Sequence, residues 1–72
     1  MKMTLGLEIR KARLKAGITE TELARRLGVS RKTVYFWERG LRFPETKRIL
    51  LLCNILGKNA NDFLIYKIED KN

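Results

Sequence analysis

The side chains that could do chemistry in this chain are concentrated in one stretch, VSRKTVYFWERG, at residues 29–40. On a helix that starts at Ser30, Val34 and Trp37 share the inward side because they lie three residues apart. The outward side then carries Arg31, Lys32, Tyr35, Phe36 and Arg39. Arginine and lysine donate hydrogen bonds to phosphates and to the acceptor edge of guanine, so these cations could bind nucleic acid.

The two aromatic rings leave three interpretations open: core residues, base-contacting residues, or the contact site of another protein. Val34 and Trp37 already fill the inward side, so at least one of Tyr35 and Phe36 must be exposed. An exposed ring can pack on a thymine methyl group, and the tyrosine hydroxyl can bind a base or a phosphate. Aromatic residues are also enriched in the hot spots of protein interfaces.

The residue inventory argues against other kinds of chemistry. The chain has no histidine, the commonest general base and metal ligand, and Cys53 is its only cysteine. We therefore expect no enzyme, no metal site and no cofactor, and the lone cysteine favours a reducing, cytoplasmic location. The longest apolar run, residues 49–53, is far too short to span a membrane.

The net charge of +8 lies in the middle of the chain. Residues 10–48 contain twelve Lys or Arg against four Glu, whereas each flanking segment is neutral. A concentrated positive field attracts polyanions and speeds encounter with them. Nucleic acid fits this pattern, and a basic segment that only keeps a small protein soluble is the other interpretation.

Glycines divide the sequence into segments of helical length, which predicts a single all-helical domain over residues 1–72. The apolar positions of residues 5–16 recur with a period near 3.6 and predict a first helix. Pro44, at a first helical position, opens a further helix through Leu56. Asn59 can cap a brief last helix at about residues 60–64.

The segment between these helices predicts two short helices joined by a tight turn. Thr19 and Glu22 fit a capping box, in which the Thr19 hydroxyl accepts from the Glu22 amide and the Glu22 carboxylate reaches back. The helix that starts there ends near Leu27, and Ser30 caps the next one only three residues later. A turn of this length is typical of a helix-turn-helix, here at about residues 19–39.

The two ends of the chain show a strand-like alternation. Leu64, Tyr66 and Ile68 alternate near the C-terminus, and Met1, Met3 and Leu5 alternate at the N-terminus. The first helix also has a second apolar face at Leu7 and Leu14. We hypothesise that the ends meet, either as a short strand pair or by packing over that face, with residues 65–72 as an extended tail.

The motifs resemble those of the Cro/C1-type helix-turn-helix family of phage repressors and small bacterial regulators. The similarity covers about residues 6–64 and is carried by ELA (22–24), LGVS (27–30), WERG (37–40), Pro44 and LG (56–57). The resemblance implies a compact all-α bundle of four to five short helices, like the DNA-binding domain of lambda repressor. It also implies that the third helix enters the DNA major groove.

Three residues can be carried over from the family as parts of the framework. The family often pairs an arginine of the first helix with a glutamate at the end of the third, which here implies a structural pair of Arg13 and Glu38; the alternative is two solvated charges. Family members commonly have glutamine at the first position of the second helix, where this chain has Glu20. We hypothesise that Glu20 braces Arg31 by an ion pair, or else only complements the positive end of its helix.

The resemblance also assigns DNA contacts. Arg31 and Lys32 lie in the first turn of the third helix, nearest the base edges, and Tyr35 and Phe36 follow on the same side. The residues expected on the DNA backbone are Ser30, Thr33, Arg39, Arg42 and Lys47. Arg25 and Arg26 are weaker candidates, because solvation alone would explain at least one of them.

Apolar residues beyond the inward faces predict a homodimer, because repressors of this kind usually bind DNA as two-fold dimers. The predicted fourth helix is apolar nearly all round. The candidate dimer seam is formed by Leu50, Leu51, Ile55, Phe63 and Ile65.

These observations predict a sequence-specific, double-stranded DNA-binding transcriptional regulator, in particular a dimeric Cro-like repressor. We expect it to be prokaryotic or phage-encoded, cytoplasmic and associated with the nucleoid, without a membrane anchor or small-molecule ligand. The alternative is a protein-binding helix-turn-helix modulator that sequesters a repressor or other partner. An antitoxin or a restriction-modification controller would share the first mechanism and differ only in genetic context.

Overall fold

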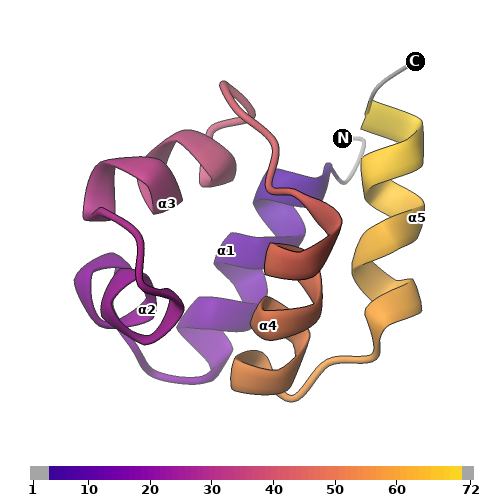
Figure 1. The fold of residues 1–72 in the computed structure, drawn as a ribbon. Helices are drawn as coiled ribbons and strands as arrows, with labels where there is room; N and C mark the ends of the chain where they lie inside the picture. Colours follow the sequence, from indigo (N-terminus) through magenta and orange to yellow (C-terminus); the bar gives the residue numbers. More distant parts are fainter. Residues whose placement is uncertain (1–3, 71–72) are drawn as a thin grey trace.

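The computed structural model describes residues 4–70 of the chain, which form five helices and no strand. In chain order the helices are α1 (Leu5–Lys15), α2 (Glu20–Leu27), α3 (Arg31–Glu38), α4 (Thr46–Leu56) and α5 (Ala60–Asp70). The predicted all-α bundle is therefore confirmed over these residues (Figure 1).

Helix α1 runs through the middle of the bundle and packs against α3, α4 and α5. Figure 1 shows α2 and α3 together at one end of the molecule and α5 at the opposite end. Because α2 packs on both α3 and α4, the helix-turn-helix unit is fixed to the body, while the outer side of α3 stays at the edge.

A single apolar core joins all five helices. Its members are Leu5, Ile9, Ala12, Leu23, Ala24, Leu27, Val34, Trp37, Ile49, Leu52, Cys53 and Phe63. Helices α1 to α4 contribute positions that lie mostly three or four residues apart, as expected for helices that bury one face, and α5 contributes Phe63. Burial of this set drives folding, because the free energy gained scales with the apolar area removed from water.

Helices α2 and α3 each begin with a side-chain cap at the residue that the sequence predicts. The Thr19 hydroxyl accepts from the Glu22 amide at 3.0 Å, and the Ser30 hydroxyl accepts from the Thr33 amide at 3.1 Å. Gly28 has φ of 72° and ends α2 in the left-handed region that suits glycine. The chain can therefore leave α2 and begin α3 within three residues.

Gly6 sets how closely α1 approaches the end of α3. A Cβ atom at this position would lie 2.5 Å from the Trp37 carbonyl oxygen and 2.7 Å from that of Glu38. Such distances are shorter than any van der Waals contact, so only glycine fits without movement of the two helices. Sequence reasoning missed this role because the contact joins residues far apart in the chain.

The start of α4 differs from the prediction. Pro44 was expected at the first helical position, but α4 begins at Thr46, after Glu45, whose backbone is extended (φ −65°, ψ 159°). The Pro44 ring is fully buried. Its packing in the interior, rather than helix initiation, therefore explains the position of this proline.

The C-terminal segment is also helical where an extended tail was expected. Helix α5 continues past residue 64 to Asp70, so the predicted strand pair is wrong for residues 64–68. Leu64 and Tyr66 pack partly buried against the core, which a helical repeat allows. The alternative, packing of the tail over the second face of α1, also fails at Leu14, which stays 57% exposed. Met1 and Met3 lie outside the described residues.

Candidate nucleic-acid interface

The outward side of α3 carries exposed cations above two half-buried rings. Arg31, Lys32 and Arg39 are exposed, while Tyr35 and Phe36 are intermediate. The centroids of the two rings lie 5.9 Å apart, with the ring planes tilted by 58°. Neither ring is part of the core, so the core interpretation is wrong for both.

Each cation of this surface lies near a ring on the same helix. The guanidinium carbon of Arg39 lies 4.2 Å from the Tyr35 centroid, and that of Arg31 lies 6.0 Å from it. The Lys32 ammonium lies 5.5 Å from the Phe36 centroid. In all three pairs the two residues are four positions apart, which places the two side chains of each pair next to each other on the helix surface. Cation–π attraction at exposed sites is worth about 0.5–1 kcal/mol.

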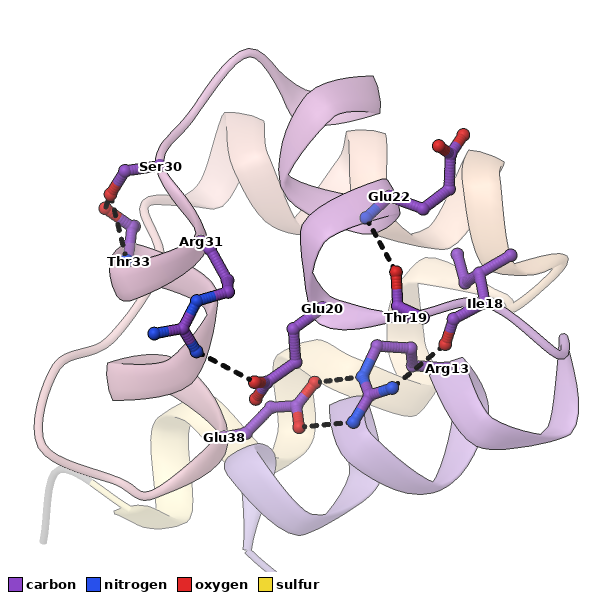
Figure 2. A network of polar contacts seen from close by, with 9 residues as sticks. All are labelled: Arg13, Ile18, Thr19, Glu20, Glu22, Ser30, Arg31, Thr33 and Glu38. Atoms are coloured by element: carbon purple, nitrogen blue, oxygen red, sulfur yellow. Dashed lines mark hydrogen bonds and ion pairs between the residues drawn. The ribbon is translucent and has the colours of Figure 1, made fainter.

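Glu20 and Arg31 form the ion pair hypothesised from the sequence. The Arg31 Nη1 atom lies 3.5 Å from Glu20 Oε1, and the Glu20 side chain is only 19% exposed (Figure 2). The carboxylate therefore joins the start of α2 to the first turn of α3. It partly neutralises Arg31 and gives its guanidinium a second neighbour besides Tyr35.

Arg13 and Glu38 form a buried, two-point ion pair behind this surface. Arg13 Nε donates to Glu38 Oε2 at 2.7 Å, and Nη2 donates to Oε1 at 3.1 Å (Figure 2). The third donor, Nη1, reaches the Ile18 carbonyl oxygen at 2.9 Å. The side chains are 9% and 0% exposed, which rules out two solvated charges. Hydrogen bonding to Glu38 raises the pKa of Arg13, although burial alone would lower it.

Glu22 forms ion pairs with both arginines of α2, Arg25 and Arg26. Its Oε2 atom lies 2.6 Å from Arg25 Nη2 and 2.7 Å from Arg26 Nε. Hydrogen bonds from Arg25 and then Arg26 lower the pKa of Glu22 to about 2. The Glu22 carboxylate thus faces the arginines, instead of making the reciprocal half of the capping box that the sequence predicts.

The residues expected on a DNA backbone lie on several elements. Besides capping α3, Ser30 shares a 2.9 Å hydrogen bond between hydroxyl groups with Thr33. Arg42 is exposed in the segment before α4, and Lys47 is exposed in its first turn. The contacts of these residues with DNA stay predictions.

Arg48 is a structural residue that sequence reasoning missed. Its Nη1 atom donates to the Leu27 carbonyl oxygen at 2.6 Å. This bond satisfies a carbonyl in the last turn of α2, where a cation is also favoured by the helix dipole. Arg48 therefore ties α4 to the end of α2, just before the turn that leads into α3.

Only some of the residues assigned to the dimer seam are exposed. Leu50 and Leu51 on α4 are 49% and 44% exposed, and Ile65 on α5 is 54% exposed, whereas Ile55 is half-buried. Phe63 is fully buried in the core of its own chain, so its assignment to the seam is wrong. The sequence pattern does not say which face of α5 packs against α1 and α4, so it did not place Phe63 in the core.

Residues 4–70 contain neither a candidate metal site nor a candidate membrane span. No group of three or more His, Cys, Asp or Glu within this segment could hold a metal ion, and none of its helices is long and apolar enough to cross a membrane. Cys53 is buried, and its thiol lies 3.6 Å from the Asn59 carbonyl oxygen. Burial raises the pKa of the Cys53 thiol, which disfavours the reactive thiolate.

Comparisons with known proteins agree with this geometry. A family profile described as helix-turn-helix matches residues 9–63. The chain is 36% identical over 67 residues to the HTH-type transcriptional regulator ImmR of Bacillus subtilis (strain 168), covering 93% of this chain but only 52% of ImmR. It is 32% identical over 62 residues to an uncharacterized HTH-type transcriptional regulator of Archaeoglobus fulgidus, covering 86% of this chain and 89% of that protein.

A solved structure has the same fold. The P22 c2 repressor, in complex with synthetic operator 9T, superposes with a TM-score of 0.78 at 28% sequence identity. The superposition covers 83% of this chain and 91% of the repressor chain. The chain therefore spans about half the length of ImmR but most of the archaeal regulator and of the P22 c2 repressor chain in that structure.

Proposed function

This chain belongs to the helix-turn-helix family of transcriptional regulators, and from that membership we propose that it binds double-stranded DNA with α3 in the major groove. The observation that carries the proposal is the outward side of α3. There Arg31, Lys32 and Arg39 are exposed at the edge of the bundle, and none of them is covered by the rest of the described chain. A similar fold is found on operator DNA in the P22 c2 repressor.

Arg31 and Lys32 are the base-contacting residues of this proposal. They occupy the first turn of α3, which lies nearest the base edges in a helix-turn-helix, and each can donate to guanine O6 and N7. Arg39, Arg42 and Lys47 supply positive charge for phosphates, and Thr33 contributes a hydroxyl. These backbone contacts set the register of the protein on DNA without specifying its sequence.

Glu20 supports Arg31 in this arrangement. A carboxylate beside DNA repels phosphates, so its presence is tolerated only where a cation neutralises it, as Arg31 does at 3.5 Å. The pair limits the directions that Arg31 can take. If Glu20→Gln tightened binding to every duplex equally, Glu20 would be only a repulsive charge and this role would be excluded.

We further propose that the chain acts as a homodimeric repressor. Leu50, Leu51 and Ile65 present apolar surface that the single chain leaves exposed. Two copies related by two-fold symmetry would place their α3 helices in successive major grooves, about one helical turn of DNA apart. A repressor that blocks a promoter needs no catalytic group, which suits a chain without histidine.

Selection of binding sites from random duplexes tests the proposed function. Wild type should enrich a sequence with two-fold symmetry that contains guanine, and R31A/K32A should enrich none. Equal enrichment of all sequences by wild type would contradict specific DNA binding. If the double variant instead kept a protein complex seen with wild type, the alternative of a protein-binding modulator would replace this proposal.

A further inference from the structure

We propose that Tyr35 is a positioning residue, whose ring holds the guanidinium groups of Arg31 and Arg39 toward DNA instead of contacting a base itself. This inference rests on the proposed function. It gives Arg31 the contact with the base and gives the Tyr35 ring the role of directing that arginine.

The spacing of the three residues creates the arrangement. Arg31 lies four residues before Tyr35 and Arg39 four residues after it, so the ring lies between two cations along one line of α3. The guanidinium of Arg39 lies 4.2 Å from the ring centroid and that of Arg31 lies 6.0 Å from it. Tyr35 is half-buried, while both cations are exposed.

Arg31 is held from two helices. The Glu20 carboxylate approaches from α2 at 3.5 Å, and the Tyr35 ring approaches from within α3. An arginine side chain has many rotamers in solution, and each neighbour that restricts them lowers the cost of fixing it on a base. The base preference of Arg31 should therefore depend on a ring that makes no base contact.

The same geometry argues against Tyr35 as a base-contacting residue. A ring contacts a thymine methyl through a π face, and the guanidinium of Arg39 lies 4.2 Å from the Tyr35 centroid, over one of the two faces. A base that used this face would have to displace the cation first. The contact also directs Arg39, whose charge is expected on the phosphate backbone.

Phe36 offers a matched comparison one position along α3. Its ring lies near a single cation, the Lys32 ammonium at 5.5 Å. Lys32 also lacks the rigid planar fork of arginine, so less geometric specificity is lost when its direction is relaxed. Removal of the Phe36 ring should therefore affect base preference less than removal of the Tyr35 ring.

The test uses Tyr35→Phe, Tyr35→Leu and Phe36→Leu, with binding measured on the duplex selected by wild type and on its single-base variants. Tyr35→Phe keeps the ring and should keep the base preference. Tyr35→Leu should lower the preference for guanine at the Arg31 position about two- to fivefold, as expected from the strength of a cation–π contact. The salt dependence of binding should not change, because no charge is lost.

Two further measurements separate positioning from a general loss of structure. In the R31A background, Tyr35→Leu should have no additional effect at that base. In the NMR spectrum of the free protein, the Arg39 side-chain protons should show an upfield ring-current shift in wild type and Tyr35→Phe that disappears in Tyr35→Leu. This second readout needs no DNA.

Three results would overturn the inference. An equal loss in Tyr35→Phe and Tyr35→Leu would show that the hydroxyl makes the contact. A changed preference at a thymine, with that at the Arg31 position intact, would show that the ring contacts a base. Absence of the Arg39 ring-current shift in wild type would show that the cation is not held. Failure of the proposed function is distinguishable from failure of this inference, because the wild-type protein itself would then prefer no duplex.

Discussion

Arg13 and Glu38 join the first and third helices through a two-point ion pair that is almost completely buried. The pair holds the last residue of α3, while Glu20 and Arg31 connect the first turn of α3 to α2. Helix α3 is thus tied to its neighbours at both ends by charged groups, through the buried Glu38 at its last residue and through Arg31, one of its exposed cations, in its first turn. A helix held in this way can present its outer side to a partner in one orientation.

Breaking the buried pair should strongly destabilise the fold. Glu38→Gln leaves the Arg13 guanidinium buried without its counter-charge, which should cost about 3–5 kcal/mol in the free energy of unfolding. Urea unfolding followed by circular dichroism measures this change. The control is Arg13→Met/Glu38→Leu, which removes both charges and should be much closer to wild type. If Glu38→Gln unfolded at the wild-type urea concentration, the pair would have no structural role.

Gly6→Ala should lower stability although alanine favours helices. The added methyl group would collide with the Trp37 and Glu38 carbonyl oxygens, and overpacking of this kind costs about 1–3 kcal/mol. Asn54→Ala, at an exposed position of α4, should instead stabilise slightly through helix propensity. Thermal unfolding of both variants checks this, with a lower melting temperature expected for Gly6→Ala and a slightly higher one for Asn54→Ala. A higher melting temperature for Gly6→Ala would show that α1 and α3 are not in close contact.

The Glu22 carboxyl should titrate with a pKa of about 2, well below its ordinary value of 4.5. A pKa that is lower in the folded state stabilises the fold above pH 4.5, and this contribution is lost as the pH falls toward 2. The stability difference between wild type and Glu22→Gln should therefore shrink over that range. Carboxyl carbon NMR measures the titration directly. Arg25→Ala/Arg26→Ala should return the midpoint toward 4.5, and a wild-type midpoint already there would contradict the pairing.

Self-association should depend on the exposed leucines of α4. Leu50→Lys/Leu51→Lys places two charges on the proposed seam and should shift the protein toward monomer in sedimentation velocity, with weaker binding to a two-fold duplex. Leu14→Lys is the matched control, because Leu14 is also exposed but lies on α1. If wild type were monomeric even on DNA, or if Leu14→Lys had the larger effect, the seam would lie elsewhere.

The local features of this fold were predictable from the sequence. Thr19, Gly28 and Ser30 define helix ends through caps that act within a few residues, so the tight turn before α3 follows from neighbours in the chain. Resemblance to a known family added the Arg13–Glu38 pair, which no local rule would have identified. The Glu20–Arg31 pair was predictable because a carboxylate beside DNA needs a cation to neutralise it.

Other contacts between distant segments were not predictable. Gly6 and Arg48 act on residues of other helices, and a sequence pattern does not say which helices meet. The pattern of residues 64–68 suits either a strand or a half-buried helix over such a short length, and packing on α1 and α4 selects the helix. The sequence pattern does not show this packing, which explains why Phe63 was assigned to a surface rather than to the core.

The central claim is that the first turn of α3 contacts guanine in the major groove, and substitution of 7-deazaguanine in the selected duplex tests it most directly. This base lacks only the N7 acceptor, so the loss of one hydrogen bond from a charged donor should weaken wild-type binding by about 1–3 kcal/mol. One of the two variants R31A and K32A lacks the side chain that contacts this guanine. In that variant, 7-deazaguanine should not weaken binding any further. Wild-type binding that is unchanged at every substituted guanine would contradict the account.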